Sequence, residues 1–494
     1  MKFVWAELAA ENRVGLVSLA NGDPDPSLYP FRKFEFEIPD VKGRHVDPVP
    51  HWRTHQAPSQ TLRAYKDAAI ERLEHPEESE ISLTIGDAFQ YTHGAGLPAT
   101  QLALGELANA FHRPPNHVVT LTLGNSDGVT KAFRLLGERG EWFLTEEFSF
   151  PGMTNAPLAY GIRWVGVKMD REGLIPGELD KVLREWDETR GKRPHVLYIV
   201  PCGQNPTGST LSLRRRQKIY DIARDWDLII IEDDPYYFLQ YDLPSVETSL
   251  TTEDFVERYA ETLVPSFVSM DVDGRVIRID SFSKVIAPGM RLGWILSNEM
   301  FHHHLVKYTD SASQHPHGFG QIFVTGMLSK RGWGLDGFVL WMQSLCKDYQ
   351  RRRDLLLEVF RNEVEPSGLA SINCAQAGMF AWIKINLEGH PRYRCGDAKE
   401  VVVETGGHQV TTRCTTNVPL LMEELLSDLR VAGLIVMPAA LFAIPDAEMD
   451  DVPSLRTSVY DRCSFFRATF CGTDEAIRAG MGKFGQALEV FFKQ

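Results

Sequence analysis

The stretch SFSKVIAPGMRLGW, residues 281–294, places one lysine shortly after a mostly apolar run, RVIRID (275–280). That run has the hydrophobic and β-branched character of a strand buried on both faces. Ligands of open α/β sheets bind beyond the carboxyl ends of the strands, so we expect Lys284 to lie at a ligand site. A lysine amine in such a place can form a Schiff base with a carbonyl compound. The stretch therefore indicates an α/β fold and a covalent role for Lys284.

The middle of the chain alternates short apolar runs with helical patterns, which is typical of an α/β domain. Four further runs have the character of buried strands: HVVTLTLG (117–124), EWFLTEE (141–147), HVLYIVP (195–201) and LIIIEDD (228–234). Helical patterns lie between them, as in SDGVTKAFRLLGERG (126–140) and LSLRRRQKIYDIARDWD (211–227). Such runs predict a parallel sheet covered by helices.

The pattern changes after about residue 335. A long helical pattern (338–364) precedes three apolar segments: AGMFAWIKI (377–385), GLIVMPAALFAI (433–444) and FFRATF (465–470). We predict a large domain at 61–335 and a smaller α+β domain at 336–494 that includes the N-terminal segment 1–60. Two polar stretches, about 245–265 and 386–418, are expected to be irregular surface insertions.

The composition is that of a soluble globular protein, with 43% hydrophobic and 24% charged residues among 494. The sequence contains no apolar run of the roughly 18 residues that would span a membrane, and its first residues do not resemble a signal peptide. Seven cysteines without paired spacing indicate reduced thiols and a cytoplasmic location. The formal charge of −14 argues against nucleic acid as a partner.

Two further predicted strand ends carry polar groups. Asn205 opens NPTG after one strand, and Asp233 ends the next strand, with Tyr236 three positions later. A buried carboxylate such as that of Asp233 would keep a neighbouring pyridine nitrogen of a ligand protonated. Asn205 and Tyr236 could donate hydrogen bonds to a phenolate oxygen on the same ring. Lys284 could bind an aldehyde carbon and then move a proton. Pyridoxal 5'-phosphate needs this set of groups, so the sequence predicts it as the cofactor.

A strand, a glycine turn and a helix follow one another in LTLGNSDGVTKAF (121–133). Free backbone N–H groups at the start of a helix favour an anion, here the cofactor phosphate. Serine hydroxyls and an arginine near Lys284 suit the same group. The predicted phosphate ligands are Asn125, Ser126, the amide of Asp127, Ser281, Ser283 and Arg291.

Arg467 lies in an apolar strand pattern, SFFRATFCG (464–472). Burying an unpaired arginine is costly, so the side chain requires a partner. Its planar fork of donors suits the α-carboxylate of an amino-acid substrate. The alternative is a salt bridge to an acid of the core.

The order and spacing of Asn205, Asp-x-x-Tyr (233–236) and Ser-x-x-Lys (281–284) resemble those of the class I/II aminotransferases, which are fold type I pyridoxal phosphate enzymes. Longer segments are similar to the aromatic and 2-aminoadipate (kynurenine-type) aminotransferases, and the two insertions resemble those of fungal aromatic enzymes. These segments are SLANGDPDPSLYPF (18–31), YTHGAGLP (91–98), EDDPYYFLQ (232–240) and SMDVDGRVIR (269–278).

The resemblance implies a large domain with a mainly parallel seven-stranded sheet between helices, a smaller α+β domain, and a homodimer with active sites at its interface. It assigns Phe150 to the ring that stacks on the pyridine, a position where many relatives have tyrosine. It assigns Tyr91 to a tyrosine that reaches the neighbouring subunit's phosphate. It also implies that Gly22, Asn205 and Arg467 lie at the substrate.

The implied activity is ping-pong transamination through a Lys284 imine, with Lys284, Asp233 and Tyr236 as the catalytic residues. An aromatic or 2-aminoadipate-type L-amino acid gives its amino group to a 2-oxo acid such as 2-oxoglutarate. One alternative is a carbon–sulfur β-lyase, since one fold supports many reactions. Another is the effector domain of a transcription regulator, but the resemblance begins near residue 18 and leaves no room for a preceding DNA-binding domain.

Histidines are clustered at two places, 302–304 and 315–317. Neither cluster has further ligands at the spacing of a known metal site. We interpret them as surface or loop histidines and predict no metal site.

Overall fold

The computed structural model describes residues 22–41, 47–55, 58–69, 71, 83–244, 246–247, 251–405, 407–445 and 458–494. None of the described helices is both long enough and apolar enough to cross a membrane.

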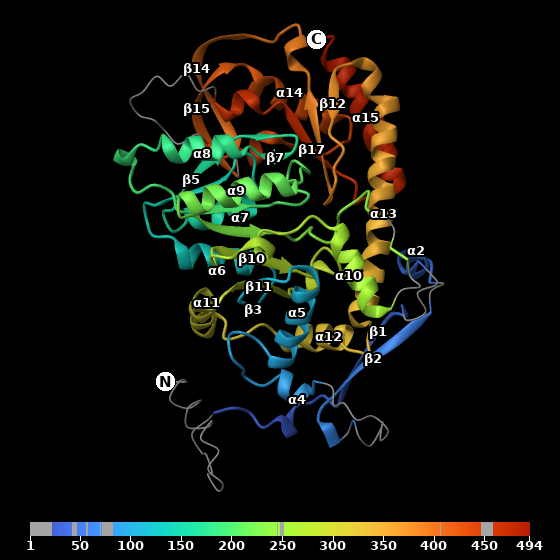
Figure 1. Cartoon of the computed structure of the whole chain (residues 1–494). Coiled ribbons are helices and arrows are strands. Elements are labelled where there is room, and N and C mark those ends of the chain that lie inside the picture. The colour runs from blue at the N-terminus through green and yellow to red at the C-terminus, as the bar shows by residue number, and fades with distance from the viewer. Residues whose placement is uncertain are drawn as a thin grey trace.

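A seven-stranded sheet forms the centre of the larger core (Figure 1), in the order β3-β11-β10-β9-β8-β4-β5. Strand β11 runs antiparallel to both neighbours, and the other pairings between adjacent strands are parallel. This confirms the predicted mainly parallel sheet of seven strands. Its strands are β3 (His117–Thr122), β4 (Trp142–Glu146), β5 (Arg163–Val167), β8 (Val196–Ile199), β9 (Ile229–Asp233), β10 (Val276–Ser281) and β11 (Gly293–Asn298).

Helices cover both faces of this sheet. Asn125 at the start of α6 contacts Asp233 of β9, whereas Arg216 of α9 lies 3.7 Å from Glu232. Because adjacent residues of a strand point to opposite faces, α6 and α9 lie on opposite faces. The helices of this part are α2 (Pro48–Arg53), α4 (Ile85–Ala88), α5 (Pro98–Phe111), α6 (Asn125–Leu136), α7 (Pro151–Leu158), α8 (Pro176–Arg184), α9 (Leu213–Asp225), α10 (Thr252–Thr262), α11 (Glu299–Ala312) and α12 (Gly318–Leu328).

The long helix α13 (Gly334–Glu363) runs from the larger core to the C-terminal part of the chain (Figure 1). There a four-stranded antiparallel sheet, in the order β12-β13-β17-β16, packs with α14 and α15 around a second hydrophobic core. These elements are β12 (Ala370–Ile372), β13 (Phe380–Ile385), β16 (Met437–Pro438), β17 (Phe465–Thr469), α14 (Val418–Val431) and α15 (Asp474–Phe491). The second core supports the predicted boundary near residue 335, and the division into domains stays a prediction.

The N-terminal segment forms an antiparallel pair, β1 (Lys33–Pro39) with β2 (Ser59–Tyr65). Strand β2 packs on α12, and Ile38 and Leu62 belong to the larger core. The described part of 1–60, which we expected to accompany the small domain, therefore packs with the larger one. The short pair β6 (Met169–Asp170) and β7 (Gly173–Leu174) also lies beside this core.

The two expected insertions are not irregular, so that prediction is wrong. Residues 252–262 form α10, which Thr251 caps and which buries Phe255 and Tyr259. Strands β14 (Cys395–Thr405) and β15 (His408–Thr416) pair as an antiparallel hairpin. Both elements expose one polar face, and this polar face concealed the periodicity of the buried one.

A fully buried charge cluster joins β9 to β10 on the α9 face. The Arg278 guanidinium lies 2.9 Å from Glu232, 2.9 Å from Asp234 and 2.7 Å from Asp280. Burial raises the pKa of Asp280 to about 8, and the adjacent Arg278 opposes this shift. Charges taken out of water are tolerated when they are paired, so Arg278 permits three carboxyl groups in one small volume.

Replacing Arg278 by leucine should leave those carboxyl groups buried without their partner. We expect a loss of about 3–5 kcal/mol in the free energy of unfolding, the usual cost of breaking a buried ion pair. Urea unfolding followed by tryptophan fluorescence would measure it. The control is Arg258→Leu, which removes an exposed pair with Glu261 at 3.1 Å and should cost less than about 1 kcal/mol. Equal losses in the two variants would contradict the role of the cluster.

Candidate active site

Asp233 ends β9 as a buried side chain at the carboxyl edge of the sheet. Its Oδ1 accepts a hydrogen bond from Asn125 Nδ2 at 2.5 Å, and its Oδ2 accepts one from the Tyr198 hydroxyl at 2.7 Å. Burial nevertheless raises the pKa of Asp233 to about 6. A cation placed beside this carboxylate would favour the ionised form. The site can therefore stabilise a protonated ring nitrogen, as the sequence predicted.

Tyr198 is a hydrogen-bond partner of Asp233 that the sequence did not reveal. It lies within β8, opposite Ile231 of β9, and so shares a face with Asp233 two positions further on. Burial raises the pKa of the Tyr198 phenol far above its usual value, so it stays a hydrogen-bond donor. In the sequence, Tyr198 is a single tyrosine within an apolar strand. Only the register of β8 with β9, which places Tyr198 beside Asp233, could have identified this contact.

The glycine turn before α6 has the geometry expected for the predicted anion site. Gly124 has φ 92°, and a Cβ there would lie 2.6 Å from Arg291 Nη2, so the turn requires glycine. Arg291 donates to the Leu123 carbonyl at 2.9 Å and to the Ser283 hydroxyl at 3.4 Å. Asn125 and Ser126 supply the first amides of the helix, which have no acceptor within it. Donors from two segments thus meet at one point.

Asp127 is only partly available to such an anion. Its carboxylate accepts from the Leu123 amide at 2.9 Å and pairs with Lys131 at 2.7 Å. Its own amide donates to the Gly124 carbonyl at 3.1 Å. The predicted contact of this amide with a phosphate therefore stays a prediction.

Lys284 follows β10 in a turn that begins at Ser281, whose buried hydroxyl accepts from the Ser283 amide at 3.3 Å. The half-buried amine makes no hydrogen bond or ion pair with the described residues. Burial raises the pKa of the Cys471 thiol, and the positive charge of Lys284 opposes that shift. The Lys284 amine therefore lies near Cys471, just after the end of β17. The amine is thus available for a covalent bond.

Arg467 projects from β17 of the smaller sheet toward the NPTG loop. Its Nη1 donates to Asn205 Oδ1 at 2.7 Å, and its guanidinium lies 4.6 Å from the ring centre of Phe380 and 4.8 Å from that of Phe442. Burial lowers its pKa, and no acidic side chain within the described ranges pairs with it. The core salt bridge considered as an alternative is therefore absent from that part of the chain.

Tyr236 lies beside this arginine, with its ring edge-on to Phe380 at 5.8 Å. Burial raises the pKa of its phenol above the usual value, so the hydroxyl stays protonated and can donate. Asn205 is also buried. The predicted pair of donors to a phenolate oxygen is thus located between the two sheets.

Three residues assigned by resemblance are exposed in the single chain. Phe150 precedes α7 and is 37% exposed, with its ring against Gly152. Tyr91 is 54% exposed and lies 6.4 Å from the His315 ring. Gly22 is exposed, and a Cβ at this position would meet no atom within 4 Å. The roles of Phe150, Tyr91 and Gly22 at the cofactor and the substrate stay predictions.

The histidine clusters have structural contacts. His302 lies in α11 and is hydrogen bonded to the Thr120 hydroxyl at 2.7 Å, while His317 caps α12 by accepting from the Gly320 amide. In the described part of the chain, His, Cys, Asp and Glu side chains form no group of three that could hold a metal ion.

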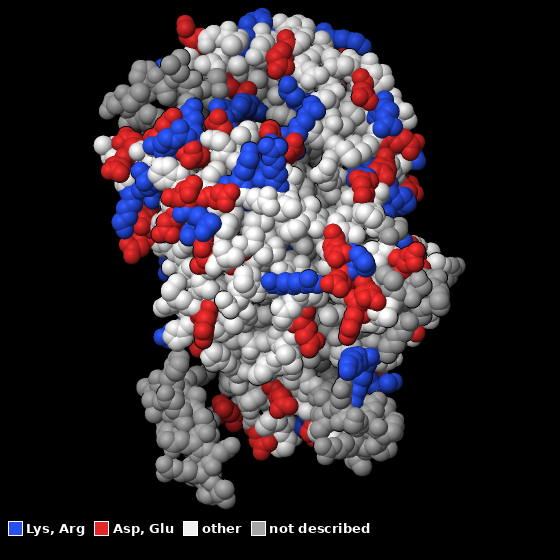
Figure 2. Space-filling model, viewed as in Figure 1, with Lys and Arg blue, Asp and Glu red and all other residues white. Residues whose placement is uncertain are grey.

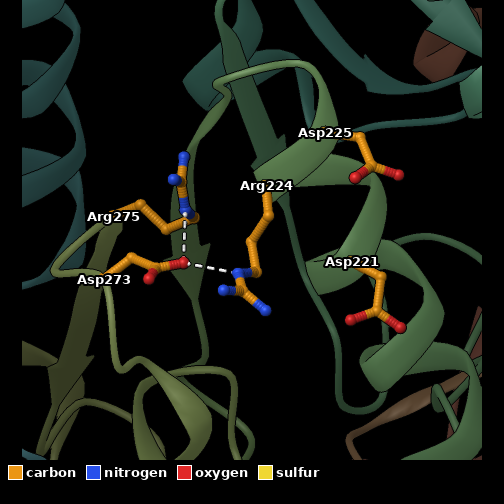
Figure 3. Close-up of a pocket in the computed structure, with 5 residues that line it drawn as sticks. All are labelled: Asp221, Arg224, Asp225, Asp273 and Arg275. Carbon is orange, nitrogen blue, oxygen red and sulfur yellow. Dashed lines mark hydrogen bonds and ion pairs between the residues drawn. The ribbon is translucent and has the colours of Figure 1, made fainter.

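A separate polar hollow lies at the opposite end of the strands (Figure 3). Its walls come from α9 and from the segment before β10, and Asp273 there pairs with Arg224 and Arg275. Lys284 follows the other end of β10, about 20 Å away at the rise of an extended strand. On the face shown in Figure 2, acidic and basic side chains are intermingled over the described surface. Neither feature suggests a second active site.

The residues at the carboxyl edge fit pyridoxal 5'-phosphate. Asn125 Oδ1 is buried without a hydrogen-bond partner, and Lys284 and Arg467 lack charged partners among the described residues. Each part of the cofactor finds a suitable group. Asp233 would hold the ring nitrogen, Asn205 and Tyr236 the phenolic oxygen, Lys284 the aldehyde carbon, and the α6 turn with Ser281, Ser283 and Arg291 the phosphate.

The fold and this site define a pyridoxal phosphate-dependent transaminase. The family model for aminotransferase class I and II matches residues 54–479, so the chain belongs to that family. This confirms the resemblance, the enzyme class and the cofactor that the sequence predicted.

The chain is similar to fungal aminotransferases along its whole length. It is 47% identical to the L-tyrosine:2-oxoglutarate aminotransferase of Serpula lacrymans, over all of this chain and 93% of the relative. It is 33% identical to an aromatic amino acid aminotransferase of Schizosaccharomyces pombe, over 77% of both chains. The crystal structure of aminotransferase Aro8 from Candida albicans superposes with a TM-score of 0.82 at 27% identity, covering 100% of this chain and 96% of that one.

Tyr198→Phe should weaken cofactor binding in a pH-dependent way. Below a pH of about 6 Asp233 takes up a proton in the cofactor-free protein and no longer attracts the protonated ring nitrogen. Loss of the Tyr198 donor raises that pKa, so affinity should decline from a higher pH. At neutral pH we expect about a tenfold loss, the scale of one hydrogen bond to a charged group.

Titration of the cofactor-free protein with pyridoxal phosphate across this pH range, followed by tryptophan fluorescence, would measure the effect. The control is Tyr237→Phe, because the ring of Tyr237 lies over Arg278 on the other face of the sheet. If the curve of Tyr198→Phe overlays the wild-type curve, the phenol does not set the charge of Asp233.

Proposed function

We propose that this enzyme transfers an amino group between an aromatic L-amino acid and a 2-oxo acid such as 2-oxoglutarate. The observation that carries the proposal is the arginine without an acidic partner in the described structure, Arg467, which lies between Phe380 and Phe442. A carboxylate bound there would balance the positive charge of the guanidinium. The two aromatic rings offer an apolar surface beside that carboxylate. The similarity to an L-tyrosine:2-oxoglutarate aminotransferase supports the same substrates.

The residues of the chain divide the work of this reaction. Bound pyridoxal phosphate supplies an electron-withdrawing ring and an aldehyde carbon that accepts the amino group. Arg467 binds the substrate α-carboxylate and so fixes the direction of the bond to the Cα hydrogen. Lys284 then removes the Cα proton as a general base and later returns it as an acid. The Asp233 carboxylate stabilises the positive charge of the protonated ring nitrogen throughout the reaction.

A carbon–sulfur β-lyase remains the second candidate because the same residues could remove a Cα proton from a cysteine conjugate. A screen of aromatic amino acids and 2-aminoadipate against 2-oxoglutarate, phenylpyruvate and pyruvate distinguishes the two. Transamination requires the oxo-acid acceptor, whereas a lyase acting on a cysteine conjugate releases pyruvate, ammonia and the thiol without it. Product formation from a cysteine conjugate alone, with no turnover of aromatic donors, would overturn the proposed function.

Lys284→Ala should abolish transamination and the visible absorbance of the lysine-bound cofactor. Removing the amine removes both the covalent attachment point and the base, and loss of a general base alone typically costs about 100- to 10,000-fold in rate. The matched control is Lys218→Ala on the exposed side of α9, which should behave as wild type. Spectra and the tyrosine assay would be recorded on both variants. Turnover in Lys284→Ala close to the control rate would refute the assignment.

We also propose a homodimer with active sites at the interface and a cytoplasmic location. Tyr91 is more than half exposed in the single chain, as expected for a residue that serves a neighbouring subunit. None of the seven cysteines, all within the described ranges, forms a disulfide, which suits a reducing compartment.

Mixed dimers test the proposed role of Tyr91. We expect Tyr91→Ala and Lys284→Ala to be almost inactive separately, because each lacks one component of every site. After mixing, unfolding and refolding, a mixed dimer has one complete site, so about a quarter of wild-type activity should return at equal amounts. Mixing Tyr91→Ala with wild-type-like Lys218→Ala should give about half of wild-type activity whether or not subunits exchange, and so serves as the reference for recovery after refolding. Absence of any recovery, in a mixture whose mass confirms mixed dimers, would contradict a shared site.

A further inference from the structure

The β14–β15 hairpin presents one buried and one exposed face. Val403 and Cys414 are 7% and 2% exposed, whereas Val402, the neighbour of Val403 on β14, is 59% exposed. Successive residues of a strand point to opposite sides. Val403 therefore lies on the inner face of β14 and Val402 on its outer face. The hairpin is therefore packed against the protein on one side.

The inner face packs into a separate hydrophobic cluster. Val403 and Cys414 share this cluster with Trp382 of β13 and with Phe442, which ends the short helix η7 (Ala439–Phe442). Phe442 is almost fully buried at 2% exposure. The cluster thus lies between the hairpin and the strand that carries the substrate-binding arginine.

Phe442 connects this cluster to the active site. Its ring centre lies 4.8 Å from the guanidinium carbon of Arg467, a cation–π distance. Trp382 occupies the register position opposite Arg467 in the β13–β17 ladder. The same two aromatic residues therefore contact the hairpin cluster on one side and border Arg467 on the other.

Hydrogen bonds fix the base of the hairpin. The Asp461 carboxylate, in the short helix η8 (Val459–Arg462), accepts from the amides and hydroxyls of Thr415 and Thr416 at 2.7–3.0 Å. Helix η7 is fixed at its other side, since the Phe442 carbonyl accepts from the Ser149 amide at 2.8 Å. Helix η7 is therefore held between the hairpin and the loop that leads to Phe150.

We propose that the β14–β15 hairpin is a positioning element for substrate recognition: it holds Phe442 against Arg467 and thereby sets the orientation of the guanidinium. This inference rests on the proposed role of Arg467 as the ligand of the substrate α-carboxylate. A small tilt of that fork would disturb two parallel hydrogen bonds at once. The amino acid and the oxo acid share the carboxylate, so both should respond alike.

The test is Val403→Ala, with Val402→Ala as its matched control on the exposed face. We expect the KM values for tyrosine and for 2-oxoglutarate to rise together by about three- to tenfold in Val403→Ala, since a small misplacement of a positioning group weakens binding. The dissociation constant of 3-phenylpropionate, which has the ring and carboxylate but no amino group, should rise by the same factor. Pyridoxal phosphate affinity and the visible spectrum should not change, and Val402→Ala should match wild type.

Asp461→Asn provides a second, independent variant because it weakens the base of the hairpin without replacing a residue of the cluster. It should raise the same KM values and leave cofactor affinity intact. If both variants bind substrate and inhibitor like Val402→Ala, the hairpin does not position Arg467. If both lose cofactor affinity in parallel, the effect is general and the proposal is overturned.

Arg467→Lys separates this inference from the function on which it rests. A large rise of KM in Arg467→Lys with normal KM in Val403→Ala and Asp461→Asn would overturn the hairpin proposal alone. Unchanged KM in Arg467→Lys would overturn the carboxylate-binding role itself, and the hairpin proposal with it.

Discussion

The active site depends on three consecutive carboxyl groups at the end of β9, those of Glu232, Asp233 and Asp234. The sheet stabilises each of them in a different way. Alternation along the strand turns Glu232 and Asp234 toward Arg278, which lies 2.9 Å from both. Asp233 points to the other face, where it receives hydrogen bonds from neutral donors and burial raises its pKa to about 6. The paired strands β9 and β10 thus leave one carboxyl group short of a cation, close to the turn that carries Lys284. A protonated pyridine nitrogen would supply that cation, which is why we expect the cofactor to suit this fold.

The ligand that we propose for the substrate carboxylate comes from the other sheet. Arg467 comes from the C-terminal core, while Asn205, its hydrogen-bond partner, comes from the loop after β8. Substrate recognition and cofactor binding therefore depend on how two separate hydrophobic cores pack together. A change in their contact would affect carboxylate binding before it affected Asp233, because Asp233 and its donors all belong to the larger core.

The sequence predicted those parts of the site that depend on position within an element. Strands buried on both faces are continuous apolar runs, so the sequence could place Asp233 and Lys284 at or just after the ends of strands. Tyr198 could not, because its role depends on which residue lies beside it in the next strand. The packing of β1 and β2 against α12, and the hairpin at 395–416, were also missed. Their polar faces hide a periodicity that becomes visible only once the opposing surface is known.

The hairpin shows how an insertion distant from the catalytic lysine in sequence can still affect recognition. It contributes no side chain to the cofactor site, yet its inner residues pack with Phe442, whose ring contacts Arg467. Packing in protein interiors is dense, so a shift on one side of an aromatic ring is transmitted to the other side. Substitutions in such an insertion can therefore alter how strongly a carboxylate is held without altering the lysine, the carboxyl group or the phosphate site. This separation lets the chemistry stay fixed while the affinity for substrates varies.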